Sequence, residues 1–509
     1  MFRYLHFIGK DVEPDTGRFI DKLSPATGQK IGEVAVGSAA DVDRAVRHAW
    51  AAFPAWREQH PMARGRILMA IATKLREHAA KLAEMERVET GKPAWQNPHE
   101  IEGSAKYFEF YAGLVSINHG EIIDLGPNYH SYTTREPFGV VGVITPWNAP
   151  LQQAARAIAP ALAVGNVVVV KPSEETPGTS AFLAQIAVEE CGLPPGVLNV
   201  VQGNGVETGA SLVSHPLVRK VAFTGSLRAG REIGKIAAER VIPLTLELGG
   251  KIPPNIVFET ADLDAAVAGS VRAFTLNAGQ ICVAGTRLLV QQSIYDDFVS
   301  RLVAAVKAVT VGPQDDAFVG AITTCAQFEK VKAYFEIGVA EGATIAAGGE
   351  ALSPEESNGG WYIRPTVFTN VKQDMRIANE EIFGPVLVVI PFSDEAEAIK
   401  IANDTDYGLG AGIWTKDLAC AHRVAAKLEA GQVFVNEYQA GGIETPMGGY
   451  KQSGYGREKG RRIAPPLLTA EVHHHPSLIR HRRVRHPCSS RQAVTPVWVA
   501  WLCLKAERP

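Results

Sequence analysis

The sequence predicts an α/β fold of two doubly wound domains, and three observations support that prediction. Short apolar runs that end in polar residues alternate with helical patterns over about 100 residues, as in a parallel sheet wrapped by helices. A second group of strand and helix patterns follows later in the chain. The composition, with 46% apolar and 21% charged residues among 509, is that of a globular chain large enough for more than one domain.

The first predicted elements are two helices, followed by three strands. From Asp41 onward, apolar side chains recur every three or four residues, which predicts an amphipathic helix with an acidic start. A second helical stretch is predicted from about Met62 to Thr90, because Gly91 and Pro93 follow it. Continuous apolar runs predict buried parallel strands at 140–144, 167–170 and 221–223.

The later elements resemble a second α/β domain, with strands predicted at 286–291, 386–391 and 432–436. No apolar run approaches the roughly 18 residues that a membrane-spanning helix needs. Six cysteines without a C-x-x-C pair are too few for a secreted disulfide framework. We therefore expect a cytoplasmic protein with no membrane partner, and the net charge of −3 argues against a nucleic-acid partner.

Polar residues gather where three predicted strands end, at 145–148, 171–174 and 224–226. Ligands of parallel α/β sheets bind beyond these carboxyl ends. The third cluster opens a helix, whose free N–H groups and dipole suit a pyrophosphate. Glycines 203, 205 and 209 form G-x-G-x-x-x-G, which is one residue longer than the dinucleotide fingerprint, so an ordinary turn is the alternative.

Two residues are candidates for chemistry, each with a structural alternative. Cys282 lies in a glycine-flanked segment, NAGQICVAG, which suggests a backbone that another group approaches closely. A buried inert thiol is the alternative. Glu247 lies in the apolar segment LTLELGGK, and a paired structural acid is the alternative there.

Taken together, these segments resemble the aldehyde dehydrogenase superfamily, in its NAD(P)-dependent, non-phosphorylating form. The resemblance covers roughly residues 5–460. It rests on TPWNAP at 145–150, VVVVKPSEETP at 167–177, FTGS at 223–226, LELGGK at 246–251, GQICVAGTR at 279–287, EEIFGPV at 380–386, NDTDYGLGAGIWTKD at 403–417 and PMGGYKQSGYGRE at 446–458.

The resemblance implies three catalytic residues. Cys282 matches the nucleophile, whose thiolate attacks the aldehyde carbonyl to give a thiohemiacetal and then a thioester. The amide of Asn148, with the backbone N–H of Cys282, matches the oxyanion donors. Glu247 matches the general base that activates water for deacylation.

The resemblance also implies an NAD cofactor, with NADP as the alternative. Lys171 and Glu174 match the residues that hold the adenosine ribose, and a carboxylate there repels a 2′-phosphate. Gly225 and Ser226 match the pyrophosphate contact. The other residues expected at the cofactor are Thr145, Trp147, Gly205, Gly209, Phe223, Leu248, Glu381 and Phe383.

The expected substrate is a polar aldehyde, because the predicted substrate side is poor in aromatic residues. Gln152, Arg156 and Met447 are expected there, and Gln152 and Arg156 share a helix face. An arginine suits a carboxylate-bearing semialdehyde or a hydroxylated, sugar-like aldehyde such as a keto-aldose. The alternative is an arginine paired to a structural acid. The loop after Glu247 also carries one residue more than the family commonly has.

Two other functions stay open: a CoA-acylating enzyme and a non-catalytic member of the family. The intact cysteine, glutamate and asparagine argue against the second. No metal is expected, because the run His473-His474-His475 lies in an unusual tail. A homodimer or homotetramer is expected from the resemblance.

The predicted domains are an NAD-binding domain (1–119 and 138–248), a catalytic domain (249–450) and an oligomerisation extension (120–137). Residues 461–509 are a basic tail without a strand or helix pattern; they hold nine Lys and Arg against two Asp and Glu. The family has a strand with a Tyr-(Ser/Thr)-x-x-Lys segment there. One back-translation of residues 465–478, read one base later, yields such a strand. We therefore hypothesise a slip of the reading frame near codon 461, which resequencing of the gene tests.

Overall fold

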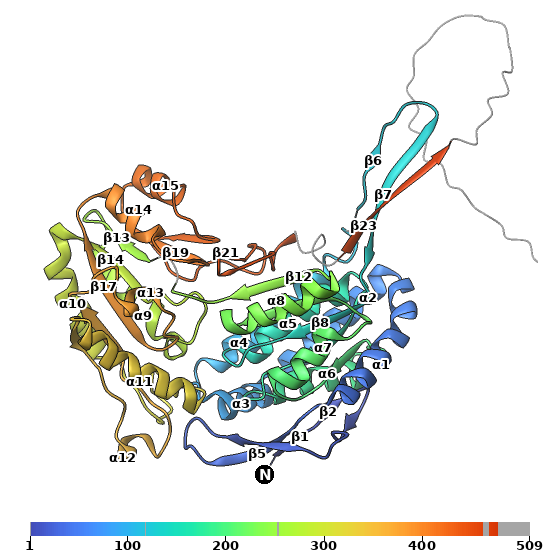
Figure 1. Ribbon diagram of the computed structural model, residues 1–509, viewed down its shortest axis with the longest axis horizontal. Helices are drawn as coiled ribbons and strands as arrows, with labels where there is room; N and C mark the ends of the chain where they lie inside the picture. The colour runs from blue at the N-terminus through green and yellow to red at the C-terminus, as the bar shows by residue number, and fades with distance from the viewer. Residues whose placement is uncertain (1, 118, 252–253, 462–467, 477–509) are drawn as a thin grey trace, which may run out of the picture. The chain divides into compact units, whose positions relative to one another are not determined.

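The computed structural model describes residues 2–117, 119–251, 254–461 and 468–476 (Figure 1). The chain divides into two compact units. The larger comprises residues 1–120 and 134–471, and the smaller comprises 121–133 with residues from 472 onward. Within the described part, no helix is both long and apolar enough to cross a membrane.

The first large sheet has eight strands in the order β22-β12-β11-β8-β9-β10-β2-β3. Its five central strands are parallel, and their apolar runs are buried on both faces. The strands are β2 (His6–Phe7), β3 (Asp11–Val12), β8 (Val140–Ile144), β9 (Val167–Lys171), β10 (Leu198–Val200), β11 (Val218–Gly225), β12 (Leu244–Leu248) and β22 (Gly454–Tyr455).

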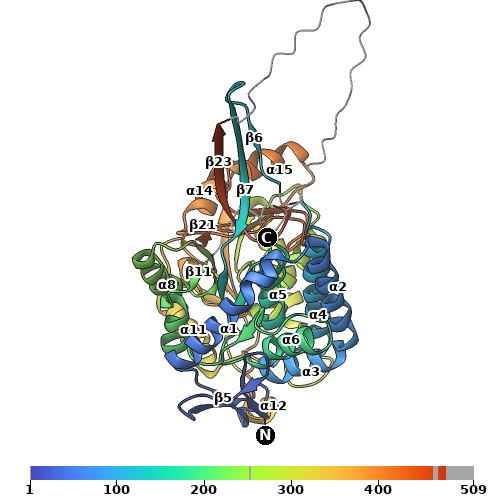
Figure 2. The ribbon, with the colours of Figure 1, turned by 90° about the vertical axis from the view of Figure 1, so that its right-hand side faces the viewer.

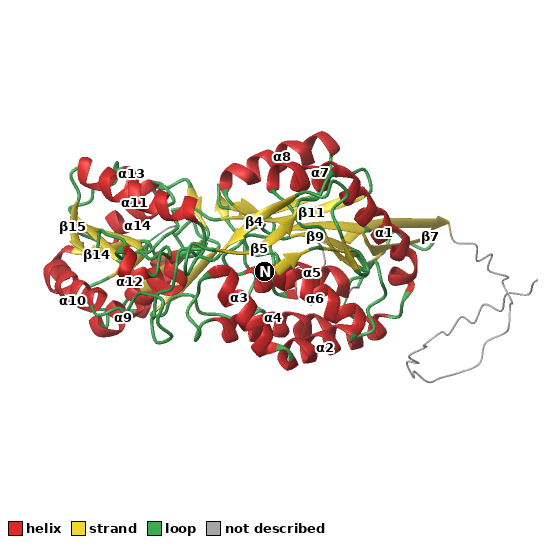
Figure 3. Cartoon of the chain, turned by 90° about the horizontal axis from the view of Figure 1, so that it is seen from below, coloured by secondary structure: helices red, strands yellow, loops and turns green. Residues whose placement is uncertain are grey.

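Helices cover both faces of this sheet (Figure 3). One face carries α1 (Ala39–Glu58), α7 (Ala210–Ser214) and α8 (Leu227–Arg240). The other carries α2 (Pro61–Glu77), α3 (Ala79–Thr90), α4 (Asn97–Ala112), α5 (Pro150–Ala163) and α6 (Gly178–Glu189). A small sheet, in the order β1-β5-β4, adds β1 (Phe2–Tyr4), β4 (Phe19–Leu23) and β5 (Lys30–Ala35).

The stretch predicted as helical from Met62 to Thr90 is helical except at one residue, where the chain divides into α2 and α3. The break lies at His78, whose φ of −90° and ψ of 12° leave the helical region. The imidazole of His78 bonds the carboxylate of Glu190 at 2.8 Å. The apolar spacing continues across the break, so the periodicity alone does not reveal it.

The second large sheet has seven strands in the order β15-β16-β17-β14-β13-β19-β20, parallel except for the β15–β16 pair. They are β13 (Asn255–Val257), β14 (Arg287–Gln291), β15 (Thr344–Ala347), β16 (Thr366–Thr369), β17 (Val386–Phe392), β19 (Gly410–Trp414) and β20 (Gln432–Val435). Helices again lie on both faces (Figure 3), which confirms the predicted doubly wound α/β class.

The remaining helices pack on the two faces of the second sheet. The helices are α9 (Leu263–Thr275) and α10 (Tyr295–Lys307) on one face of the second sheet, and α11 (Cys325–Ala340), α13 (Arg376–Asn379), α14 (Glu395–Asn403) and α15 (Leu418–Ala425) on the other, with the short α12 (Pro354–Ser357). β18 (Tyr407–Gly408) pairs with β21 (Tyr450–Lys451).

A separate three-stranded sheet has the order β23-β7-β6 (Figure 2). Its strands are β6 (Ile122–Ile123), β7 (Tyr129–Pro137) and β23 (Leu468–Pro476). The expectation that the tail lacks a strand is therefore wrong for 468–476. Edge pairing uses backbone groups, which every residue here except proline offers, so a sequence without a strand pattern can still pair. The rest of the predicted tail, 462–467 and 477–509, lies outside the described residues.

Candidate active site

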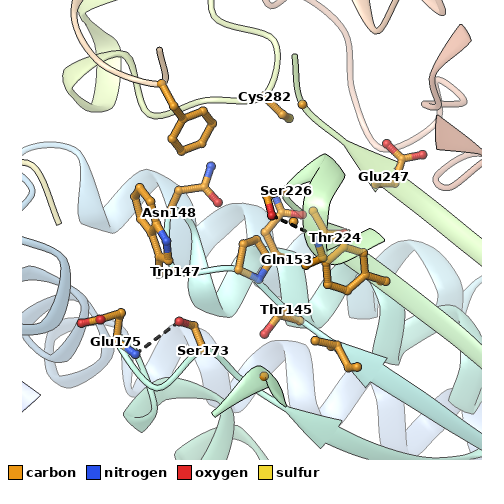
Figure 4. A pocket seen from close by; sticks show the side chains of 18 of the residues that line it. Thr145, Trp147, Asn148, Gln153, Ser173, Glu175, Thr224, Ser226, Glu247 and Cys282 are labelled. Atoms are coloured by element: carbon orange, nitrogen blue, oxygen red, sulfur yellow. Dashed lines mark hydrogen bonds between the residues drawn. The ribbon is translucent and has the colours of Figure 1, made fainter. Parts of the chain in front are cut away.

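A cavity of about 430 Å³ lies beyond the carboxyl ends of the parallel strands of the first sheet. The segments that follow β8, β9 and β11 all line it, as the position of ligand sites in such sheets predicts. Figure 4 places Cys282, Asn148 and Glu247 around this space. Of the predicted residues, Thr145, Trp147, Asn148, Lys171, Glu174, Gly205, Phe223, Gly225, Ser226, Glu247, Cys282, Glu381 and Phe383 line it.

Cys282 is presented by a tight turn that follows α9. Asn277, Ala278 and Gly279 all have positive φ angles, of 51°, 52° and 72°. A Cβ on Gly279 would lie 2.2 Å from the carbonyl oxygen of Gly384, so only glycine fits at that position. Gly279, three residues before the cysteine, therefore allows a close approach of two backbones, and the strained turn holds the thiol at the cavity.

The thiol of Cys282 is partly buried and packs against Met447 and Leu409. Burial raises the pKa of this thiol to about 11, and the guanidinium of Arg156 opposes that rise. The thiolate is the nucleophilic form, so a positive neighbour favours the reactive state.

Asn148 lies between β8 and α5 and is held by the cysteine-bearing turn. Its side-chain amide donates to the carbonyl of Gln280 at 2.8 Å, and Asn277 donates to the carbonyl of Asn148 at 3.0 Å. A side-chain amide has two N–H donors. One is used by Gln280, so the second is available to an oxyanion formed at Cys282.

Glu247 lies near the end of β12 and is only 3% exposed. Within the described residues, neither oxygen of its carboxylate accepts a hydrogen bond. Burial, together with the nearby Glu458 carboxylate, raises the pKa of Glu247, while Arg156 lowers it. A carboxylate with free lone pairs and a raised pKa has the properties of a general base at neutral pH. Residues 252–253, in the predicted loop insertion after it, lie outside the described residues.

The part of the cavity that is predicted to bind the cofactor combines an ion pair with a helix N-terminus. The ammonium of Lys171 lies 3.0 Å from the carboxylate of Glu174, which keeps 32% of its side chain exposed. Ser226 is the N-cap of α8 and accepts from the N–H of Ala229. The helix therefore presents its remaining free N–H groups beside the cavity, as a phosphate group requires.

Glu381 and Phe383 reach the cavity from the segment before β17. Glu381 accepts from the N–H of Gly250 at 2.7 Å. The ring of Phe383 packs edge-on against that of Trp147, with ring centres 5.4 Å apart. Phe383 has a φ of 60°, an uncommon backbone conformation for a bulky residue.

Two residues that the sequence did not indicate hold this segment in place. Lys330 donates to the carbonyl of Glu381 at 2.7 Å, and Gln327 donates to the carbonyls of Ile382 and Phe383 at 2.7 and 3.0 Å. Both also line the cavity. Their spacing of three residues on one face of α11 is the only signal in the sequence that could have found them.

Two predicted cofactor residues do not line the cavity. Gly209 ends the turn that begins at Gly205 and lies against the Lys171 side chain. Leu248 is 3% exposed and uses its N–H to bond the carbonyl of Ser453 at 3.0 Å. Among the residues that the structure describes, no group of three or more His, Cys, Asp and Glu side chains is placed to hold a metal ion.

Arg156, one of the three predicted substrate residues, is held by other side chains of this protein. Arg156 is 4% exposed and forms an ion pair with Glu458. It also donates to Thr224 at 3.0 Å and contacts the sulfur of Met447 at 3.5 Å. Arg156 does not line the cavity that contains Cys282. The guanidinium is thus paired to an acid of this chain, which is the alternative raised for it above.

We expect Arg156→Leu to destabilise the protein, because it leaves the Glu458 carboxylate buried without its counter-charge. Removal of one partner of a buried ion pair costs about 3 kcal/mol or more of unfolding free energy. Thermal unfolding followed by calorimetry measures the loss. The double variant Arg156→Leu/Glu458→Met removes both charges and should recover much of it. If the double variant is no more stable than the single one, the ion pair is not the reason.

Comparisons with known proteins agree with this geometry. The model of the "Aldehyde dehydrogenase family" matches residues 12–467. A betaine aldehyde dehydrogenase of Rhizobium leguminosarum bv. trifolii is 45% identical over 458 residues, which cover 89% of this chain and 93% of the relative.

Solved structures share the fold over nearly the whole chain. Betaine aldehyde dehydrogenase from Staphylococcus aureus, in complex with NAD+, has a TM-score of 0.90 at 38% identity and covers 94% of this chain and 96% of that one. HpcC from Thermus thermophilus has a TM-score of 0.90 at 39% identity and covers 96% and 95%. The family model matches most of the chain, and the chain has the two wound sheets and the cysteine at the cavity that the comparison leads one to expect. The chain therefore belongs to the aldehyde dehydrogenase family.

Proposed function

We propose that the protein oxidises a polar aldehyde to the carboxylic acid with NAD as the hydride acceptor. The observation that carries the proposal is that one cavity brings together a thiol, a side-chain amide donor and a buried carboxylate. These are the three groups that attack on a carbonyl, stabilisation of its oxyanion and hydrolysis of a thioester require.

Each residue has one task in this reaction. The Cys282 thiolate adds to the aldehyde carbon, and the amide of Asn148 donates to the oxygen that becomes negative. Loss of hydride from the adduct leaves a thioester on the sulfur. Glu247 then removes a proton from the water that attacks this thioester, which releases the acid and restores the thiol.

The residues of the cavity fit NAD. Glu174 offers a partly exposed carboxylate for ribose hydroxyls, and a negative charge there disfavours the 2′-phosphate of NADP. The N-terminus of α8 suits a pyrophosphate, and Gly225 has no side chain in its path. Bound there, NAD supplies the hydride acceptor. Six of the similar solved structures are described as NAD+ complexes, which supports the same cofactor.

A panel of aldehydes tests the proposal. NADH release at 340 nm should be detected with NAD and be weaker with NADP, and a semialdehyde or hydroxylated aldehyde should exceed a simple aliphatic or aromatic one. Betaine aldehyde belongs in the panel because of the relatives' names. Added CoA should not raise the rate if water is the acyl acceptor, which separates this function from CoA acylation. Absence of NADH formation with every aldehyde would refute the proposal.

We expect a homodimer or homotetramer in the cytoplasm. Ile122, Leu125 and Tyr129, in and beside β6 and β7, are 80%, 47% and 59% exposed. Apolar side chains clustered on a strand extension favour contact with another copy of the chain. Light scattering measures the assembly, and the free thiols of Cys191 and Cys420 are consistent with a reducing compartment.

A further inference from the structure

A second cavity, of about 630 Å³, lies among α4, α5, the segment 441–444 and Lys459. Gln152, predicted as a substrate residue, lines it, as do Tyr107 and Phe110 of α4. None of the residues that are predicted to hold the cofactor lines this second cavity. This space is therefore available to something other than the cofactor.

The second cavity is next to the first along α5, because Gln153 lines the first cavity and Gln152 lines the second. The Tyr107 hydroxyl and the Lys459 ammonium are both close enough to Cys282 and Glu247 to interact with them electrostatically. A molecule whose aldehyde carbon lies at Cys282 can therefore extend toward Lys459.

Most charges around this cavity already have partners. The carboxylate of Glu109 lies 2.6 Å from a guanidinium nitrogen of Arg76. Lys106 is on the surface, 59% exposed, and lies 3.9 Å from Glu102. Arg156 is neutralised by Glu458, as described above. These groups do not offer a free charge to a ligand.

Two charged side chains of this cavity, Lys459 and Glu444, have no such partner among the described residues; Glu444 is exposed to solvent, whereas Lys459 is half-buried. Across residues 2–117, 119–251, 254–461 and 468–476 no hydrogen bond or ion pair within 4.0 Å is found for the Lys459 ammonium. Burial, reinforced by the positive charge of Arg156, lowers the pKa of Lys459, while Glu444 opposes this. The backbone of Lys459 has a φ of 64°, a conformation that is costly for a residue other than glycine and is found at ligand sites.

We infer that Lys459 binds the carboxylate of an anionic aldehyde, so that the preferred substrate is an ω-oxo carboxylate. The inference rests on the proposed function and names its substrate class. A carboxylate in the second cavity would give the half-buried ammonium a partner that the described residues do not supply, and the Gln152 amide can donate to the same group. A trimethylammonium group has no acceptor to offer the Lys459 ammonium.

The test compares charged and uncharged aldehydes of the same length. 4-Oxobutanoate and butanal, with the three-, five- and six-carbon members of each series, are assayed by NADH release with the full-length protein and NAD. The wild type should have a higher kcat/KM for the oxo acid. Lys459→Met should lower kcat/KM for the oxo acid by about 10- to 100-fold, mainly through KM, and change that for butanal less than about threefold.

Two further variants control for structure. Lys459→Arg keeps the positive charge and should retain most of the preference for the oxo acid. Lys235→Met removes a lysine of α8 that is 69% exposed and should change neither substrate. An equal loss for both aldehydes in Lys459→Met, or a wild type that does not prefer the oxo acid, would overturn the inference while leaving aldehyde oxidation intact. Failure to oxidise any aldehyde would instead overturn the proposed function and the inference with it.

Discussion

Cys282→Ala should abolish NADH formation, lowering kcat/KM on the order of 10⁴-fold or more. Without the sulfur no adduct forms with the carbonyl, so neither the first turnover nor later ones can proceed. The effect should be the same for every aldehyde and at every pH. Stopped-flow absorbance at 340 nm measures both the first turnover and the steady state.

The matched control is Cys325→Ser, which changes an exposed cysteine at the start of α11. It should keep the wild-type rate. Thermal unfolding of Cys282→Ala should stay close to that of the wild type, because the change removes one partly buried sulfur. Residual activity of Cys282→Ala above a few per cent would mean that another group is the nucleophile.

The fold could be predicted largely because buried parallel strands have a clear signature. The runs VVGVI and VVVV are buried along their whole length in β8 and β9, and polar residues follow each strand at the cavity. The break at His78 could not be predicted from periodicity, since apolar positions continue on both sides of it. β23 could not be predicted because strand pairing along an edge depends on the partner backbone rather than on side-chain alternation.

A site residue could be predicted where the same short segment contains the residue and the feature that positions it. Cys282 follows a glycine that the close backbone approach requires, so the local sequence carries the signal. The partner of Arg156 is Glu458, about 300 residues later in the chain, and only the folded structure brings the two together. The same holds for Lys459, because its place at the second cavity, without a partner among the described residues, is known only from the fold.

Glu247→Gln should separate the two halves of the reaction. The first turnover should persist, because Cys282 and Asn148 perform it without this carboxylate. Later turnovers should slow by about 10²- to 10⁴-fold, since the amide cannot take the proton of the attacking water. A burst of NADH close to one equivalent per active site, followed by a slow phase, is the expected trace. Equal loss of the burst and the slow phase would contradict the role of a base in deacylation.

The pH dependence of the wild type provides an independent measure of the same group. Burial and the Glu458 carboxylate raise the pKa of Glu247 to about 8, so the carboxyl keeps its proton to a higher pH than an ordinary glutamate does. The base works in its ionised form, and the steady-state rate should therefore rise with pH through about 8 and then level off. Glu247→Gln should lose this rise. The burst rate should still increase with pH, because the pKa of the Cys282 thiol is raised to about 11 and the thiolate fraction grows over the whole range. Two different pH profiles for burst and steady state would assign one titration to each residue, and a single shared profile would mean that one group limits both steps.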